Sequence, residues 1–160
     1  MAIQVGDRIP PVALKAVTPE GTRDVKADEL FAGKKVVLFG LPGAFTPTCS
    51  AQHLPGYVTH ADALKQKGVD LIACLSVNDA FVMGAWSRDQ KAGGKIRFMA
   101  DGSAEYSKKL GLTLDLTARG MGIRANRYSM LVDDGVVKTL NVEAPGKFEV
   151  SDGATMLKQA

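Results

Sequence analysis

Cys49 is the residue best suited to chemistry in this sequence, and it lies in the stretch PGAFTPTCS from Pro42 to Ser50. This stretch follows an apolar run and precedes a segment rich in helix-forming residues. We therefore expect Cys49 in the first turn of a helix. Free backbone N–H groups and the positive end of the helix dipole stabilise a thiolate there, and the thiolate is the nucleophilic form of cysteine.

Other residues of the same loop could assist that thiolate. Thr46 lies three residues before Cys49, so its hydroxyl can reach the sulfur or an oxygen bound beside it. Pro42 and Pro47 stiffen the loop, and Gly43 permits a close turn. On these local features alone, an inert buried cysteine at a helix start is the alternative to a reactive one.

The second cysteine, Cys74, lies within the apolar segment DLIACLSV. A thiol in the middle of a strand is poorly placed to reach a helix start without backbone movement. We therefore expect Cys74 to be a buried structural residue rather than a disulfide partner of Cys49.

Two cysteines and two histidines at unrelated spacings make a poor zinc site, so we expect neither a metal ion nor a cofactor. His53 lies four residues after Cys49 and therefore on the same helix face. It could tune the thiol, but packing or hydrogen bonding near Pro55 is the expectation that we favour.

The elements that must position these residues alternate along the chain. We expect strands at 35–39, 70–77, 96–99, 128–132 and 136–142, and helices at 50–67, 80–90, 104–110 and 150–158. Pro55 and Gly56 should kink the first helix. Phe81, Ala85 and Trp86 should share one side of the second. The sequence Asp133-Asp134-Gly135 is a hairpin turn signal between the last two strands.

This order predicts an α/β fold. The early alternation implies parallel strands joined by right-handed crossovers, and the late hairpin adds antiparallel strands. A mixed central sheet with helices on both faces follows. That description matches a thioredoxin-like fold, among other α/β arrangements. The 160 residues suit a single domain, 1–160.

The composition of the chain argues against nucleic acids and membranes as partners. The 20 basic and 17 acidic residues give a net charge of +3, and they are scattered, so we expect no nucleic acid partner. No segment has the length and apolarity of a membrane span, and no secretory signal is visible. These features favour a cytoplasmic protein, although removal of an organellar transit peptide would leave the same picture.

Pro42, Thr46 and Cys49 have the PxxxTxxC spacing of the peroxiredoxin active-site signature. The fuller stretch PGAFTPTCSAQHLPGY resembles the atypical type-five subfamily, which includes the plant type II enzymes. The resemblance continues in VNDAFVMGAW and RYSMLVDDGVVKTLNVE, and so covers nearly the whole chain. It implies a thioredoxin-like fold and a thiol peroxidase.

The resemblance also implies a mechanism, in which the Cys49 thiolate attacks the terminal peroxide oxygen and becomes a sulfenic acid. It places a distant arginine beside the sulfur, and the matching position is Arg127 rather than the nearby Arg124. The Arg127 guanidinium, the Thr46 hydroxyl and backbone N–H groups near Thr48 and Cys49 would donate hydrogen bonds to the peroxide oxygens. Pro42 would shield the sulfur from water.

Many type-five members carry a resolving cysteine near the C-terminus, whereas APGKFEVSDGATMLKQA contains none. The chain thus resembles members whose sulfenic acid is reduced by an external thiol, such as glutathione with glutaredoxin. Thioredoxin is the alternative reductant.

Relatives of this type commonly form homodimers, for which Phe45 and the segment from Phe81 to Trp86 are candidate contacts.

Two other classes of function stay open at this point. One is a redox-sensing interaction protein that uses oxidised Cys49 as a switch. The other is a thiol–disulfide oxidoreductase on the same fold, although that chemistry normally uses a CxxC pair, which this sequence lacks.

Overall fold

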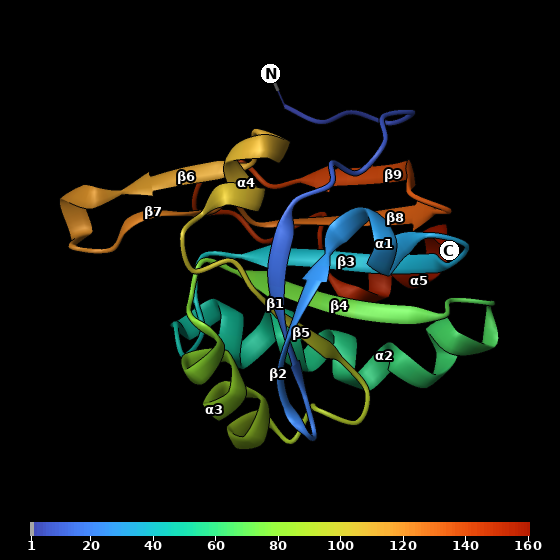
Figure 1. Cartoon of the computed structure of the whole chain (residues 1–160), viewed down its shortest axis with the longest axis horizontal. Coiled ribbons are helices and arrows are strands. Elements are labelled where there is room, and N and C mark those ends of the chain that lie inside the picture. Colours follow the sequence, from blue (N-terminus) through green and yellow to red (C-terminus); the bar gives the residue numbers. More distant parts are fainter. Residues whose placement is uncertain (1) are drawn as a thin grey trace.

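The computed structural model describes residues 2–160, and its centre is a seven-stranded mixed sheet (Figure 1). The strand order is β2-β1-β5-β4-β3-β8-β9. Strands β3, β4 and β5 run parallel, and the other pairings are antiparallel. The strands are β1 (Ala13–Thr18), β2 (Gly21–Lys26), β3 (Lys35–Leu41), β4 (Leu71–Ser76), β5 (Arg97–Ala100), β8 (Tyr128–Asp133) and β9 (Val136–Val142).

Helices cover both faces of this sheet, which confirms the predicted mixed sheet and thioredoxin-like arrangement. One face packs against α1 (Ala27–Phe31) and α4 (Glu105–Leu110). The other packs against α2 (Leu54–Gln66), α3 (Ala80–Gln90) and α5 (Gly153–Gln159). Side chains of β3 alternate between the two apolar clusters, with Leu38 in the first and Phe39 in the second. This alternation is the period of a strand buried on both faces.

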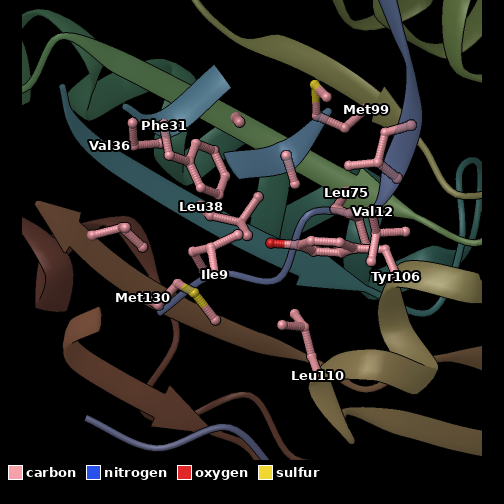
Figure 2. Close-up of a cluster of buried hydrophobic side chains, with 14 of the residues drawn as sticks. Ile9, Val12, Phe31, Val36, Leu38, Leu75, Met99, Tyr106, Leu110 and Met130 are labelled. Atoms are coloured by element: carbon pink, nitrogen blue, oxygen red, sulfur yellow. The ribbon is translucent and has the colours of Figure 1, made fainter. Parts of the chain in front are cut away.

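Figure 2 shows the first apolar cluster, in which the Tyr106 ring lies near Val12, Leu75 and Leu110. Each is buried. The second cluster holds both cysteines, together with the apolar side of α2. The cysteines therefore lie on the face of the sheet that α2, α3 and α5 cover.

A separate two-stranded hairpin projects from the sheet (Figure 1). It consists of β6 (Thr113–Leu116) and β7 (Gly122–Ala125), joined through the 3-10 turn Thr117–Arg119. The sequence pattern predicts neither this hairpin nor β1, β2 and α1. The strands of the hairpin have four residues each, and most of these residues are exposed or half-buried.

The predicted helix over 50–67 is two elements. Cys49–His53 forms a π-helical turn in which the Leu54 N–H donates to the Cys49 carbonyl, and α2 follows directly. Pro55 lacks the N–H that a continuous α-helix would direct to the Ala51 carbonyl. The irregularity expected at Pro55 is therefore a wider turn immediately before it.

Two further expectations need correction. Phe81 does not share a side with Trp86, because Phe81 is 86% exposed and Trp86 is fully buried. The last helix begins at Gly153 rather than at Val150, because the Asp152 side chain accepts a hydrogen bond from the Thr155 N–H and caps the helix there. The hairpin turn is confirmed, with positive φ angles at Asp134 and Gly135.

Candidate active site

Cys49 lies where the loop after β3 enters the π-helical turn, and its side chain is fully buried. Two contacts hold this entry. The Ala44 N–H donates to Asn78 Oδ1 at 2.9 Å, which ties the loop to the residues after β4. The Trp86 indole N–H donates to Ser50 Oγ at 3.0 Å, which ties the turn to α3. The parallel strands β3 and β4 thus bring both loops to one edge of the sheet.

Arg127 is the charged residue in contact with the sulfur. Its Nη2 donates to Cys49 Sγ at 3.2 Å, although 78 positions separate the two residues. Arg127 directly precedes β8, whose first residue, Tyr128, pairs with Gly40 of β3. The Tyr128 ring occupies the space in which a Cβ at position 40 would lie. A glycine near the end of β3 therefore leaves room for the ring of Tyr128, the residue that follows Arg127.

Arg124 has a different role in the structure. It donates from Nη1 to the Pro42 carbonyl at 3.2 Å and from Nε to the Met121 carbonyl at 2.9 Å. A Cβ at Gly43 would lie 2.8 Å from Arg124 Nη1, so a larger residue there would force the end of the Arg124 side chain to shift. Arg124 thus links β7 to the loop before Cys49.

The Thr46 hydroxyl is not directed at the sulfur. Its hydrogen goes to the Gly43 carbonyl, with an Oγ1 to oxygen distance of 2.6 Å. A hydroxyl has one hydrogen and two lone pairs, so Thr46 Oγ1 is left to accept hydrogen bonds rather than donate them. Thr46, which the sequence analysis expects to donate a hydrogen bond to the peroxide, can therefore only accept one from it in this arrangement.

A groove of about 510 Å³ opens beside this site. Its near wall contains Pro42, Thr46, Thr48 and Arg127, which are four of the five residues that the sequence predicts for the site. Cys49 lies beneath that wall. The far walls come from the β6–β7 hairpin and from the loop after β9; they include Leu114, Leu116, Met121, Phe148, Arg119 and Lys147.

His53 is fully buried between Arg127 and the C-terminal segment. Its Nδ1 lies 2.9 Å from Arg127 Nη1, and its Nε2 lies 3.1 Å from the Ser151 carbonyl oxygen. Burial, together with the neighbouring Arg127 guanidinium, lowers the pKa of His53 from 6.5 to about 3. The ring is therefore neutral at physiological pH.

Glu143 anchors the C-terminal segment. Its carboxylate accepts from the backbone N–H groups of Glu149, Val150 and Ser151 at 2.8 to 3.0 Å, and from the Ser151 hydroxyl at 2.7 Å. Although burial alone raises it, these hydrogen bonds bring the pKa of the Glu143 carboxyl below its ordinary value. Sequence reasoning missed Glu143 and Ser151, because no local motif marks a carboxylate that binds a loop several residues away.

Cys74 lies in β4, opposite Phe39 of β3, and is fully buried. Burial raises the pKa of its thiol well above the ordinary value, so Cys74 is a neutral thiol. Both cysteines are free. Within residues 2–160, no group of three or more His, Cys, Asp or Glu side chains could hold a metal ion, and no helix is long and apolar enough to cross a bilayer.

Comparison with known proteins agrees with this geometry. The Redoxin family model matches residues 4–157. Peroxiredoxin-2B of Arabidopsis thaliana is 48% identical over 92% of this chain and 98% of its own length. The chloroplastic Peroxiredoxin-2E of the same plant is 49% identical over 98% of this chain and 69% of its own length. Reduced Prx3 of Vibrio vulnificus, crystallised in complex with H2O2, superposes with a TM-score of 0.94 at 55% identity, over 98% of each chain.

The fold, the buried thiol with its arginine and these similarities together define a redox protein of the thioredoxin-like class. The chain belongs to the redoxin family and, within it, to the peroxiredoxins, which are thiol peroxidases.

Proposed function

We propose that this peroxiredoxin reduces hydrogen peroxide and alkyl hydroperoxides at Cys49. The observation that carries the proposal is the 3.2 Å contact from Arg127 Nη2 to Cys49 Sγ beside an open groove. A guanidinium is always charged, and its hydrogen bond to an anionic sulfur is charge-assisted. The pair therefore supplies a nucleophile and a fixed cation at the place where a peroxide enters.

The reaction is a displacement at oxygen. The Cys49 sulfur forms a bond to the terminal peroxide oxygen while the O–O bond breaks. Sulfur is oxidised to a sulfenic acid, the peroxide is reduced, and the leaving hydroxide or alkoxide takes a proton from solvent. Negative charge spreads over both oxygens in the transition state, and Arg127, with backbone N–H groups near Thr48 and Cys49, stabilises it there.

Thr46 contributes as an acceptor. Because its own hydrogen is bound by the Gly43 carbonyl, the free lone pairs of Oγ1 can accept the hydrogen of the attacked peroxide oxygen. That contact orients the O–H group, while Arg127 binds the oxygens as a donor. Pro42 closes the groove wall against water next to them.

The groove supports a substrate range beyond hydrogen peroxide. A water molecule occupies roughly 30 Å³ in the liquid, and H2O2 has only one more oxygen atom. The groove of about 510 Å³ is therefore much larger than a bound H2O2 molecule. Leu114, Leu116 and Met121 line its far side. Burying an alkyl group against such a wall gains about 0.8 kcal/mol per methylene. An alkyl hydroperoxide can therefore place its apolar part there.

An external thiol completes the cycle in this proposal. Cys74 is a buried neutral thiol in the middle of a strand, and the sequence has no third cysteine. Glutathione with glutaredoxin is the reductant that we propose, with thioredoxin as the alternative.

We also propose a cytoplasmic enzyme that forms a homodimer through the region of Phe45 and Phe81, which are 53% and 86% exposed.

Peroxide consumption by the full chain tests the proposal. With dithiothreitol as reductant, wild type should consume both hydrogen peroxide and cumene hydroperoxide. Cys49→Ser should lose essentially all turnover, and Cys74→Ser should keep it, which makes Cys74→Ser the matched control. Equal slow consumption by wild type and Cys49→Ser would refute a peroxidase.

The reductant is tested in the same assay. Replacing dithiothreitol by glutathione plus glutaredoxin should sustain turnover of wild type and of Cys74→Ser alike. Turnover with thioredoxin alone would favour the alternative reductant. Loss of turnover in Cys74→Ser, with every reductant, would contradict the external-thiol scheme.

A further inference from the structure

His53 stands between the arginine that contacts the sulfur and the segment that leads into α5. Arginine carries only hydrogen-bond donors, so Arg127 Nη1 must donate to His53 Nδ1. A neutral imidazole carries its one hydrogen on the other nitrogen. Nε2 therefore donates to the Ser151 carbonyl at 3.1 Å. The two partners together select a single tautomer, with the hydrogen on Nε2.

This bond fixes the orientation of the guanidinium. Arg127 uses one terminal nitrogen for His53 Nδ1, at 2.9 Å, and the other for Cys49 Sγ, at 3.2 Å. The Phe148 ring lies 5.7 Å from the guanidinium carbon and limits its movement out of plane. Because the guanidinium is planar and rigid, an acceptor that holds one nitrogen also aims the other.

The anchor of His53 is itself held firmly. The Ser151 carbonyl also accepts from the Tyr57 hydroxyl at 2.8 Å, and the Ser151 N–H is bound by the Glu143 carboxylate at 2.8 Å. The charged groups that act on the ring are Arg127, Glu143 and Asp152. Contacts thus run from Glu143 through Ser151 and His53 to the arginine.

We propose that His53 is a positioning residue for the peroxidase reaction, which accepts a hydrogen bond from Arg127 and thereby aims the other guanidinium nitrogen at Cys49 Sγ. The proposal rests on the proposed function of Cys49 and adds a residue that touches neither the sulfur nor the groove. A neutral ring suits this role, because an imidazolium has no lone pair to offer and would repel the guanidinium.

The test compares two substitutions of His53 in the full chain. His53→Leu removes the acceptor at similar bulk, and we expect kcat/KM for hydrogen peroxide to fall about ten- to hundred-fold, as for loss of a hydrogen bond to a charged group. His53→Asn places an amide oxygen near the position of Nδ1, and we expect it to recover most of that loss. Failure of His53→Asn to recover activity would overturn the proposal.

Tyr57→Phe is the matched control. It removes the other hydrogen bond to the Ser151 carbonyl but leaves Arg127 untouched, so kcat/KM should stay within about two-fold of wild type while stability falls. A loss in Tyr57→Phe equal to that in His53→Leu would show that only the C-terminal segment matters, and would overturn the proposal.

Nitrogen NMR of the His53 ring gives a readout that does not depend on turnover. We expect one neutral tautomer, protonated at Nε2, across the physiological pH range. Rapid exchange between tautomers would contradict a fixed bond to Arg127. Absence of Cys49-dependent turnover in wild type would refute the proposed function instead, and would leave this tautomer measurement valid.

Discussion

At the scale of single residues, His53 shows how burial converts an ordinary titratable group into a fixed hydrogen-bond partner. Its pKa of about 3 in the folded chain lies below the value of 6.5 expected without the fold. Protonation is therefore unfavourable in the folded state and free to occur in the unfolded state. The sign follows from linkage: between these two values the unfolded chain binds more protons, so stability falls as pH falls.

The first prediction concerns this pH dependence. Lowering the pH from 6.5 to 5 should reduce the free energy of unfolding of wild type by about 1.5 kcal/mol through His53. His53→Asn should lack this contribution. Urea unfolding at the two pH values measures both proteins, and the range avoids most of the titration of carboxyl groups. Parallel pH dependence in the two proteins would contradict the assignment.

The sequence predicts some residues of the active site directly and others only through a family resemblance. Cys49, Thr46 and Pro42 lie in one local motif, so their grouping in space follows from the chain itself. Arg127 could be named only through a family resemblance, because 78 positions separate it from Cys49. The direction of the Thr46 hydrogen and the partner of His53 depend on backbone carbonyls, and a carbonyl has no signature in a sequence.

At the scale of elements, α5 packs closely against α2 where Gly153 meets the backbone of Gly56. A Cβ added to Gly153 would lie 2.7 Å from the Gly56 carbonyl oxygen and 2.9 Å from its carbonyl carbon. Both are backbone atoms and cannot rotate away. The close approach of these helices therefore requires the absence of a side chain, and it determines where Ser151, two residues before Gly153, presents its carbonyl to His53.

The second prediction follows from this contact. Gly153→Ala should displace α5 from α2 and lower the free energy of unfolding by about 1–3 kcal/mol. Ala154→Ser, at the exposed neighbouring position, should change stability by less than about 0.5 kcal/mol. Urea unfolding measures both variants. Wild-type stability in Gly153→Ala would contradict the tight contact.

The elements that the sequence predicted well are the ones with the strongest patterns. Helix α3 was expected at the residues where it occurs, and the apolar runs of β3 and β4 mark buried central strands. Strand β2 was not expected, because its residues are mostly polar and exposed. The β6–β7 hairpin was not expected, because each of its strands has only four residues, mostly exposed or half-buried. Tertiary pairing rather than local preference makes them strands.

At the scale of the whole molecule, two aromatic side chains, Phe45 and Phe81, are largely exposed to solvent. Phe81 lies in the first turn of α3, and Phe45 lies in the loop before Cys49 with a positive φ of 64°. A non-glycine residue in this left-handed conformation carries strain, which the surrounding contacts must offset. An association that covers both phenylalanine rings would bury about as much apolar area as two core residues.

The third prediction tests that association. Wild type should sediment as a dimer, and Phe81→Asp should shift it to the monomer, because a buried carboxylate in the interface is costly. Val5→Asp is the control, since Val5 is also exposed but lies in the N-terminal segment near β9, away from α3 (Figure 1). Sedimentation velocity over a range of concentrations distinguishes the species. A wild type that stays monomeric would contradict the proposed dimer.

The π-helical turn at Cys49–His53 has a consequence for how this chain can change in evolution. Its i to i+5 bond gives the turn one residue more than an α-helix would hold. Each residue of an α-helix advances the side-chain direction by about 100°. Deletion of the exposed Ala51 or Gln52 would remove the extra residue of this turn and swing Cys49 away from Arg127 by about that angle. Substitutions should be tolerated at these two positions, whereas insertions and deletions should not.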